Sequence, residues 1–294
     1  MRRVRFLLTF LACLLSVPTA ARPLVAVIDS GIARTDELRP YLIGEIDVAS
    51  PRPRPAFQPR FDHGTMIATV LQRTAGGKAA ILSLRVDEPA GCPSGRNPPC
   101  QRNPGVVAWA IYQAVAHRAD VINISMALPD APVISRAIAF AAWHGTQVVL
   151  ASGNDARHVP GNLGHARAGY PNAVLVGALN RDGTPWPKTN RPATDATDGY
   201  IFTWRWGADM PTVGLNGPKT ASGTSLAAPI EAGLRLRAKA AAGPSLLLGS
   251  AKSRIKRRPV MLAGTMYPDV RAKLCKAGAS GRVSARCLSP GLMV

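Results

Sequence analysis

Val25-Ala-Val-Ile-Asp-Ser-Gly31 is the stretch that decides the fold of this chain. It starts with four consecutive apolar residues and ends in an aspartate, a serine and a glycine. A short continuous apolar run predicts a strand that is covered on both faces, as in a parallel sheet. Parallel sheets present functional groups at the carboxyl ends of their strands. We therefore expect Asp29 to stand at such an edge.

Similar apolar runs recur along the chain, and segments with helical periodicity separate them. Strands are expected at 24–28, 79–86, 121–124, 147–151 and 173–178, and helices at 63–72, 104–117, 131–144 and 224–240. This alternation is typical of an α/β protein whose sheet lies between two layers of helices. We predict a three-layer, doubly wound fold with a mostly parallel sheet and helices on both of its faces.

Two later segments place reactive side chains at the starts of predicted helices. Asp62-His-Gly-Thr-Met-Ile-Ala68 puts His63 at the first of these starts. Thr220-Ala-Ser-Gly-Thr-Ser-Leu-Ala-Ala-Pro229 puts Ser225 at a glycine-rich turn that leads into the second. Each segment alone is a weak signal, because an aspartate at a strand end or a histidine at a helix start is common. An aspartate, a histidine and a serine in this order form a strong signal.

A fourth segment, Val149-Leu-Ala-Ser-Gly-Asn154, ends another predicted strand. Over about residues 24–240, the four segments together resemble the subtilisin-like serine peptidases, the subtilases, and the order Asp, His, Ser is that of subtilisin. The resemblance implies a subtilisin-like fold and a serine endopeptidase. It also implies that peptide bonds are cleaved through an acyl-enzyme on Ser225, so the expected partner is a protein or peptide substrate.

The resemblance gives each motif a role that its chemistry explains. A serine hydroxyl is a weak nucleophile, so His63 would accept the proton of Ser225 and later return it to the leaving amine. Asp29 would hold the imidazole in the required tautomer and stabilise its protonated form. The Asn154 amide, together with the backbone N–H of Ser225 and the helix dipole, would stabilise the developing oxyanion.

A substrate cleft is implied by a further segment, Val121-Ile-Asn-Ile-Ser125, which resembles the strand that flanks bound substrate in subtilases. Tyr170-Pro-Asn-Ala-Val-Leu-Val-Gly177 resembles a core strand of the same fold. The residues expected to bind substrate are Ser125, Met126, Ala127, Ser152 and Gly153.

The chain departs from the family pattern at two places. Met66 stands where a second histidine is usual in the His motif, a position with a structural role. Ala127 and Leu128 stand where the substrate-pairing strand usually continues into two glycines. Because glycine lets a peptide approach the backbone closely, we expect these two side chains to narrow the cleft or reshape its subsites.

An export signal is predicted for residues 1–21, because a cationic start precedes an apolar run at 6–17 and a segment of small residues. A transmembrane helix is the alternative, but the run is shorter than the roughly 20 residues that span a bilayer. Arg2-Arg3 and Cys13 fit a twin-arginine signal and a lipid-attachment site only loosely. We expect a secreted or periplasmic protein that starts near Arg22 and does not span a membrane.

The expected domains are the signal at 1–21, a subtilisin-like peptidase domain at 22–240 and a basic extension at 241–294. Subtilases that are secreted usually carry a prosegment before the catalytic domain. Only residues 22–28 lie between the predicted signal and Asp29, and all of them belong to the first strand. No separate prosegment is therefore expected, and the chain would fold slowly by itself or with help from a partner.

The chain is strongly basic, with 36 Lys and Arg against 17 Asp and Glu and a formal charge of +19. The extension at 241–294 carries ten of the basic residues and one aspartate. Such a segment could anchor the protein on nucleic acid or on an anionic surface, or it could be a solvated extension without a binding role. We favour the solvated extension. Aromatic residues make up only 5% of the chain and do not alternate with basic ones, so a nucleic-acid stacking platform is not supported.

Removal of the signal leaves four cysteines, an even number that fits an oxidising compartment. The short loops between them favour disulfides from Cys92 to Cys100 and from Cys275 to Cys287. A zinc site is the alternative, but neither pair has the spacing and the nearby histidine that such a site needs.

No cofactor or metal is expected. Calcium commonly stabilises subtilases, yet no segment is dense enough in Asp and Asn to suggest a site for it. The remaining histidines are expected at the surface rather than as ligands: His117, His144, His158 and His165. Two other functions are considered: a catalytically weak or inactive subtilase-like protein that binds peptides, and an envelope or nucleic-acid-binding protein that depends on its basic tail.

Overall fold

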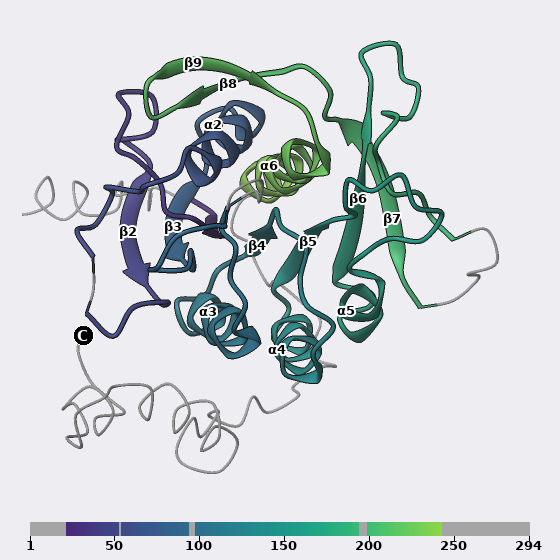
Figure 1. Ribbon diagram of the computed structural model, residues 1–294, viewed down its shortest axis with the longest axis horizontal. Coiled ribbons are helices and arrows are strands. Elements are labelled where there is room, and N and C mark those ends of the chain that lie inside the picture. Colours follow the sequence, from purple (N-terminus) through teal and green to yellow (C-terminus); the bar gives the residue numbers. More distant parts are fainter. Residues whose placement is uncertain (1–21, 53, 94–97, 194–198, 243–294) are drawn as a thin grey trace, which may run out of the picture.

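The computed structural model describes residues 22–52, 54–93, 98–193 and 199–242. The predicted export signal, the Cys275 to Cys287 pair and nearly all of the basic extension lie outside these residues. Within them, a seven-stranded sheet lies between two layers of helices (Figure 1). All of its strand pairs are parallel. The predicted three-layer α/β fold is therefore confirmed.

The sheet has its first strand near the middle, so the chain crosses over in both directions from it. The strand order is β2-β3-β1-β4-β5-β6-β7. The strands are β1 (Leu24–Asp29), β2 (Leu42–Asp47), β3 (Ala80–Arg85), β4 (Val121–Ile124), β5 (Gln147–Ala151), β6 (Ala173–Leu179) and β7 (Ile201–Trp206). Because parallel strands end at one edge, the residues after β1, β4 and β5 gather there.

Each face of the sheet is covered by its own helices (Figure 1). One face packs against α3 (Pro104–Ala116), α4 (Pro132–Trp143) and α5 (Leu163–Ala168). The other packs against α2 (His63–Ala75) and α6 (Thr224–Ala242). Alternate residues of β1 enter the two cores, with Ala26 and Ile28 in the first and Val25 and Val27 in the second. This explains why β1 is apolar from Leu24 to Ile28, before it ends in Asp29.

The structure adds elements that the apolar pattern did not predict. The edge strand β2 and the opposite edge strand β7 are only partly buried, so polar residues interrupt both. Helix α5 has six residues, too few to show a helical period. An antiparallel hairpin, β8 (Met210–Gly214) and β9 (Gly217–Ala221), contains proline and glycine, which are uncommon in strands. No helix among the described residues is both long and apolar enough to cross a membrane.

Helices α2 and α6 lie side by side and touch through Gly233. A Cβ atom at Gly233 would lie 2.7 Å from the Cβ of Thr74 and 2.8 Å from the carbonyl oxygen of Leu71. The hairpin packs over α2, where the Thr212 hydroxyl donates to the Met66 carbonyl at 2.9 Å. Because α2 begins at His63 and α6 begins at Thr224, this packing sets the relative position of two of the predicted motifs.

We expect Gly233→Ala to destabilise the protein by about 1–3 kcal/mol, because an added methyl group overpacks the contact between α2 and α6. Urea unfolding measures the effect. Gly164→Ala in α5 is the control, since nothing lies within 4 Å of the added Cβ and alanine favours a helix by about 1 kcal/mol. Equal stability of the two variants would contradict the close packing.

Candidate active site

The predicted aspartate and histidine form a hydrogen-bonded pair at the end of β1. His63 Nδ1 lies 2.8 Å from Asp29 Oδ1 and 3.0 Å from Oδ2. The side chain of Asp29 is 1% exposed and that of His63 is 13% exposed. Burial acts to lower the pKa of His63, but attraction to the Asp29 charge and the hydrogen bond between them outweigh it. The pKa of His63 therefore lies above its usual value of 6.5.

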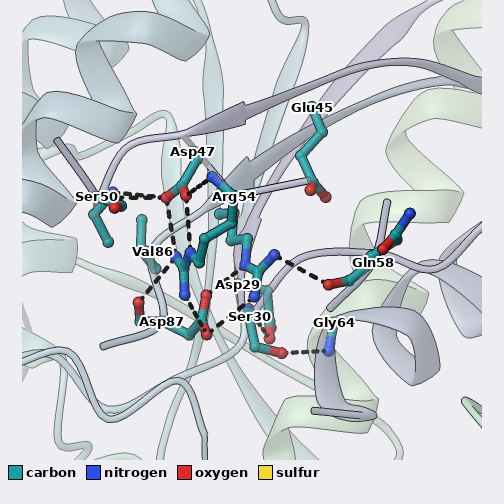
Figure 2. Close-up of polar contacts among 12 residues, drawn as sticks. Asp29, Ser30, Glu45, Asp47, Ser50, Arg54, Gln58, Gly64, Val86 and Asp87 are labelled. Atoms are coloured by element: carbon teal, nitrogen blue, oxygen red, sulfur yellow. Dashed lines mark hydrogen bonds and ion pairs between the residues drawn. The ribbon is translucent and has the colours of Figure 1, made fainter. Parts of the chain in front are cut away.

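This pair forms because the start of α2 abuts the turn after β1. A Cβ atom at Gly64 would lie 2.2 Å from the carbonyl oxygen of Gly31, so only glycine permits the approach. The Gly64 N–H donates to the Ser30 hydroxyl at 3.2 Å, and the Ser30 N–H donates to Asp29 Oδ1 at 2.7 Å. Figure 2 shows Asp29, Ser30 and Gly64 together at this junction.

Asp62 connects the start of α2 to the hairpin. Its carboxylate accepts hydrogen bonds from the Leu215 N–H and the Lys219 ammonium group. Burial acts to raise the pKa of Asp62, but these two contacts outweigh it and hold that pKa below its usual value. The aspartate before His63 thus fixes the hairpin against α2.

The predicted serine and asparagine meet at the start of α6. Asn154 Oδ1 accepts the Thr224 N–H at 2.9 Å and the Thr224 hydroxyl at 2.8 Å, so its Nδ2 is left to point elsewhere. A Cβ atom at Gly223 would lie 3.1 Å from Asn154 Nδ2 and 3.2 Å from Ser225 Oγ. The amide donor and the hydroxyl therefore flank one small space. The Ser225 N–H belongs to the first turn of α6, where backbone donors lack helical partners.

A cavity of about 520 Å³ brings these residues together. It is lined by His63, Asn154 and Ser225, and by two segments that leave the carboxyl edge of the sheet. The lining residues of these segments are Ser125, Met126 and Ala127 after β4, and Ala151, Gly153 and Asp155 from the end of β5 onward. The arrangement can hold an extended chain next to a hydroxyl, an imidazole and an amide donor.

Asn162 joins the two segments, and the sequence motifs did not point to it. Its buried amide donates to the carbonyl oxygens of Met126 and Ala151, and its Oδ1 accepts the Leu128 N–H. Leu128 itself is buried in the core, so the expectation that it narrows the cleft is wrong. Ala127 is exposed and lines the cavity.

Asn190 holds the segment around Asn154, as Asn162 holds the segments after β4 and β5. Its Oδ1 accepts the N–H groups of Asp155 and Arg157, and its Nδ2 donates to the Ser152 carbonyl. The Ser152 side chain is fully buried and donates to the Asn190 carbonyl, so it supports the loop and does not face the cavity. Gly153 has φ +105°, and a Cβ there would lie 2.4 Å from Asn190 Nδ2.

A buried ion-pair network lies beside Asp29 (Figure 2). Arg54 contacts Asp47 and Asp87, each at 2.8 Å, and Arg85 contacts Asp87 at 2.7 Å. Both aspartate side chains and that of Arg85 are nearly inaccessible to solvent. Arg54 thus ties the segment before α2 to the ends of β2 and β3, while its neighbours Pro51, Arg52 and Pro55 are exposed.

The ion pairs of this network lower the pKa of Asp47. Burial acts to raise the pKa of Asp47, but hydrogen bonds to Arg54 and the charges of Arg54 and Arg85 hold it below its usual value of 3.8. A carboxylate with a depressed pKa contributes stability that is present above the unfolded pKa and is lost as the pH falls through the folded one. The network is therefore intact at neutral pH.

Among the described residues, no group of three or more His, Cys, Asp or Glu could hold a metal ion. Calcium needs six to eight oxygen ligands, and the buried carboxylates of Asp47 and Asp87 already face guanidinium groups. The residues here do not fit a calcium ion at this position.

A disulfide joins Cys92 to Cys100, with 5.5 Å between the Cα atoms, as predicted for this pair. One histidine prediction is wrong, because His165 is buried. Its Nδ1 lies 2.9 Å from the Ser135 hydroxyl and its Nε2 lies 3.0 Å from the Pro129 carbonyl oxygen. Helix α5 was not predicted, so nothing in the sequence indicated that His165 faces α4.

Comparison with known families decides the assignment that the geometry suggests. The model of the subtilase family, Peptidase_S8, matches residues 21–257. The chain belongs to the subtilase family. This subtilase is thus a member of a family of serine peptidases, which act on proteins or peptides. No curated protein sequence shows a significant match to it.

Solved structures show the same fold. The prenylagaramide maturation protease PagA is 20% identical, with a TM-score of 0.58 over 76% of this chain and 77% of PagA. A serine-to-alanine mutant of the PatA protease domain is 19% identical, with a TM-score of 0.57 over 74% of this chain and 79% of that domain. A cold-adapted subtilisin-like serine proteinase is 21% identical, with a TM-score of 0.57 over 71% of this chain and 72% of that proteinase.

We expect Arg54→Met to destabilise this subtilase by about 3 kcal/mol, because it leaves the buried Asp47 carboxylate without its cation and removes one of the two cations that Asp87 faces. Urea unfolding at neutral pH measures the change. Arg39→Met is the matched control, since Arg39 pairs with Asp36 at the surface and such pairs contribute about 1 kcal/mol or less. A loss for Arg54→Met no larger than that for Arg39→Met would show that the network is not stabilising.

Proposed function

We propose that this subtilase is an exported serine endopeptidase with the triad Asp29, His63 and Ser225. The observation that carries the proposal is the meeting of the Asp29–His63 hydrogen bond, the Ser225 hydroxyl and the Asn154 amide around one cavity. Export rests on the predicted signal at 1–21 and on the Cys92–Cys100 disulfide, which fits an oxidising compartment.

The reaction follows from the positions of these groups. Ser225 Oγ attacks the carbonyl carbon of the scissile bond and transfers its proton to His63. Asn154 Nδ2 and the Ser225 N–H donate to the oxygen that becomes negative. His63 then protonates the leaving amine, which departs and leaves an acyl-enzyme on Ser225. A water molecule, deprotonated by His63, hydrolyses this ester and restores the serine.

Two buried residues prepare the imidazole and the oxyanion donor before substrate arrives. Asp29 holds the Nδ1 proton of His63, so the other ring nitrogen is free to act as the base. Thr224 binds Asn154 Oδ1 through two donors, which fixes the orientation of the amide. Donors that are already oriented need no reorganisation when charge develops.

Ser225→Ala and His63→Ala should each abolish casein cleavage while the fold is retained, because the triad acts as one unit. Asn154→Ala should lower kcat roughly 100- to 1,000-fold with a small change in KM, since its amide binds the transition state; the oxyanion asparagine of subtilisin is the model for this magnitude.

A fluorophosphonate probe should label the wild type and leave Ser225→Ala unlabelled. Circular dichroism on each variant checks that the fold is retained. Casein cleavage by Ser225→Ala at the wild-type rate would refute the assignment, and a folded wild type without labelling or cleavage would favour the peptide-binding alternative.

The pH dependence tests the Asp29–His63 pair separately. Neutral His63 is the base, so activity should rise as the pH increases through the raised pKa of this imidazole. Asp29→Asn should move that pKa downward and lower kcat by about four orders of magnitude. The pair also contributes stability below the unfolded pKa of 6.5, and this contribution is lost as the pH rises through the folded value.

Proton NMR titration of His63 in Ser225→Ala protein, with and without Asp29→Asn, measures the imidazole directly. An imidazole that titrates at the same pH in both proteins would show that the carboxylate does not control it.

A further inference from the structure

The rim of the cavity is formed by a segment that the triad does not use. We call residues 88–93 and 98–103 the disulfide rim, because the Cys92–Cys100 bond ties the two parts together. Pro93, Pro98, Pro99, Gln101 and Arg102 of this rim line the same cavity as Ser225. Its position therefore allows it to contact a bound peptide.

The disulfide rim is held in place at several points. The Glu88 N–H donates to the Pro99 carbonyl at 3.1 Å, and the Gln101 amide donates to the Val86 carbonyl at 2.8 Å. Asn103 caps α3 by accepting the Gly105 N–H at 2.9 Å. Arg102, between Gln101 and Asn103, is thus fixed at its backbone while its side chain is exposed.

Arg102 differs from most charged residues near the site because it makes no ion pair within the described part of the chain. Arg54, Arg85 and Arg73 all face carboxylates. Arg60 is also exposed and unpaired there, and its Nη1 lies 3.3 Å from the place of a Cβ on Gly91 of the rim. Arg102 lines the cavity, whereas Arg60 contacts the rim at Gly91, outside the cavity lining.

The positions of the other groups indicate whether the disulfide rim faces the acyl part or the leaving part of a bound peptide. His63 must protonate the leaving amine, and the hairpin residues Leu215 and Lys219 pack against the start of its helix. Among the described residues, the cavity lining includes none from this hairpin, whereas it includes both the segment after β4 and the disulfide rim. We therefore assign the part of the cavity formed by the segment after β4 and the disulfide rim to the acyl part of the substrate, beyond His63.

The negative charge of Asp155 bears on where along the acyl part of a peptide an acidic side chain can bind. Asp155 lines the cavity next to Asn154, its side chain is 60% exposed, and it lies 4.0 Å from Arg157. Arg157 does not line the cavity, so a carboxylate close to the scissile bond would face the Asp155 carboxylate and be repelled. A carboxylate further along the acyl part would face Arg102 instead.

We propose that Arg102 makes this subtilase select peptides with an acidic residue on the acyl side of the scissile bond, not directly at it. The proposal rests on the endopeptidase function above and adds its substrate class. A guanidinium group suits this role because it stays charged at all relevant pH values and binds carboxylates through two donors.

The test uses internally quenched peptides that are neutral except for one Glu, moved along the sequence, each paired with a peptide that carries Gln at that place. The wild type should show a kcat/KM ratio of Glu to Gln peptide of about two to five at one acyl position beyond the first, as expected for a partly exposed ion pair. The ratio should fall as salt is added.

Arg102→Gln should bring this ratio to about one, and Arg102→Glu should invert it. Arg136→Glu is the matched control, because Arg136 is exposed on α4, does not line the cavity and undergoes the same change of charge. It should keep the wild-type ratio. Because each ratio compares two peptides with one enzyme, the fraction of active protein cancels.

Three results would overturn the proposal: a wild-type ratio near one at every position, a preference only on the leaving side, or the same loss in Arg136→Glu as in Arg102→Glu. Fluorophosphonate labelling separates this failure from that of the proposed function. A wild type that is labelled and cleaves peptides without preferring Glu refutes only the substrate class, whereas one that is neither labelled nor active refutes the endopeptidase function.

Discussion

The close contact between α2 and α6 is the constraint on which the site depends. His63 and Ser225 are far apart in the sequence, and each lies in the first turn of one of these helices. Both helices cover the same face of the sheet, so a small shift between them would separate the two side chains. Gly233 lets the helices approach closely, and the Thr212 to Met66 hydrogen bond adds the hairpin as an outer support.

Buried charged residues near Asp29 also help to fix the position of the site. The pairs among Asp47, Arg54, Asp87 and Arg85 connect β2, β3 and the segment before α2. Such a network adds little net stability when compared with apolar packing, but removing one partner is costly. Its value here is positional, because Arg85 also packs against Gly31, the residue whose carbonyl meets the start of α2.

Much of the fold was predictable because buried parallel strands and amphipathic helices leave strong local patterns. The first strand shows this best, since residues that alternate between two cores must all be apolar. The edge strands β2 and β7 were missed because each is only half-buried and carries polar residues. A short helix such as α5 leaves no period, and the burial of His165 was missed with it.

The site was predictable to the extent that its groups end regular elements. Asp29, His63 and Ser225 each follow a strand or start a helix, so short motifs identify them, although their roles remain proposals. Asn162 and Asn190 lie in irregular segments and act on residues that are distant in the sequence. The ion pairs of Arg54 could not be predicted, because Asp47 ends β2 and Asp87 follows β3, and only the folded sheet brings these two strand ends together.

Asn162 has a consequence for how tightly a peptide can bind. One buried amide holds the segments after β4 and β5 at a fixed separation, so the groove is already shaped before a peptide enters it. Little chain entropy then has to be lost by the enzyme on association. For the proposed peptidase we expect the same rigidity to disfavour bulky substrate side chains next to Ala127, because a wall held at its carbonyl groups cannot move aside for them.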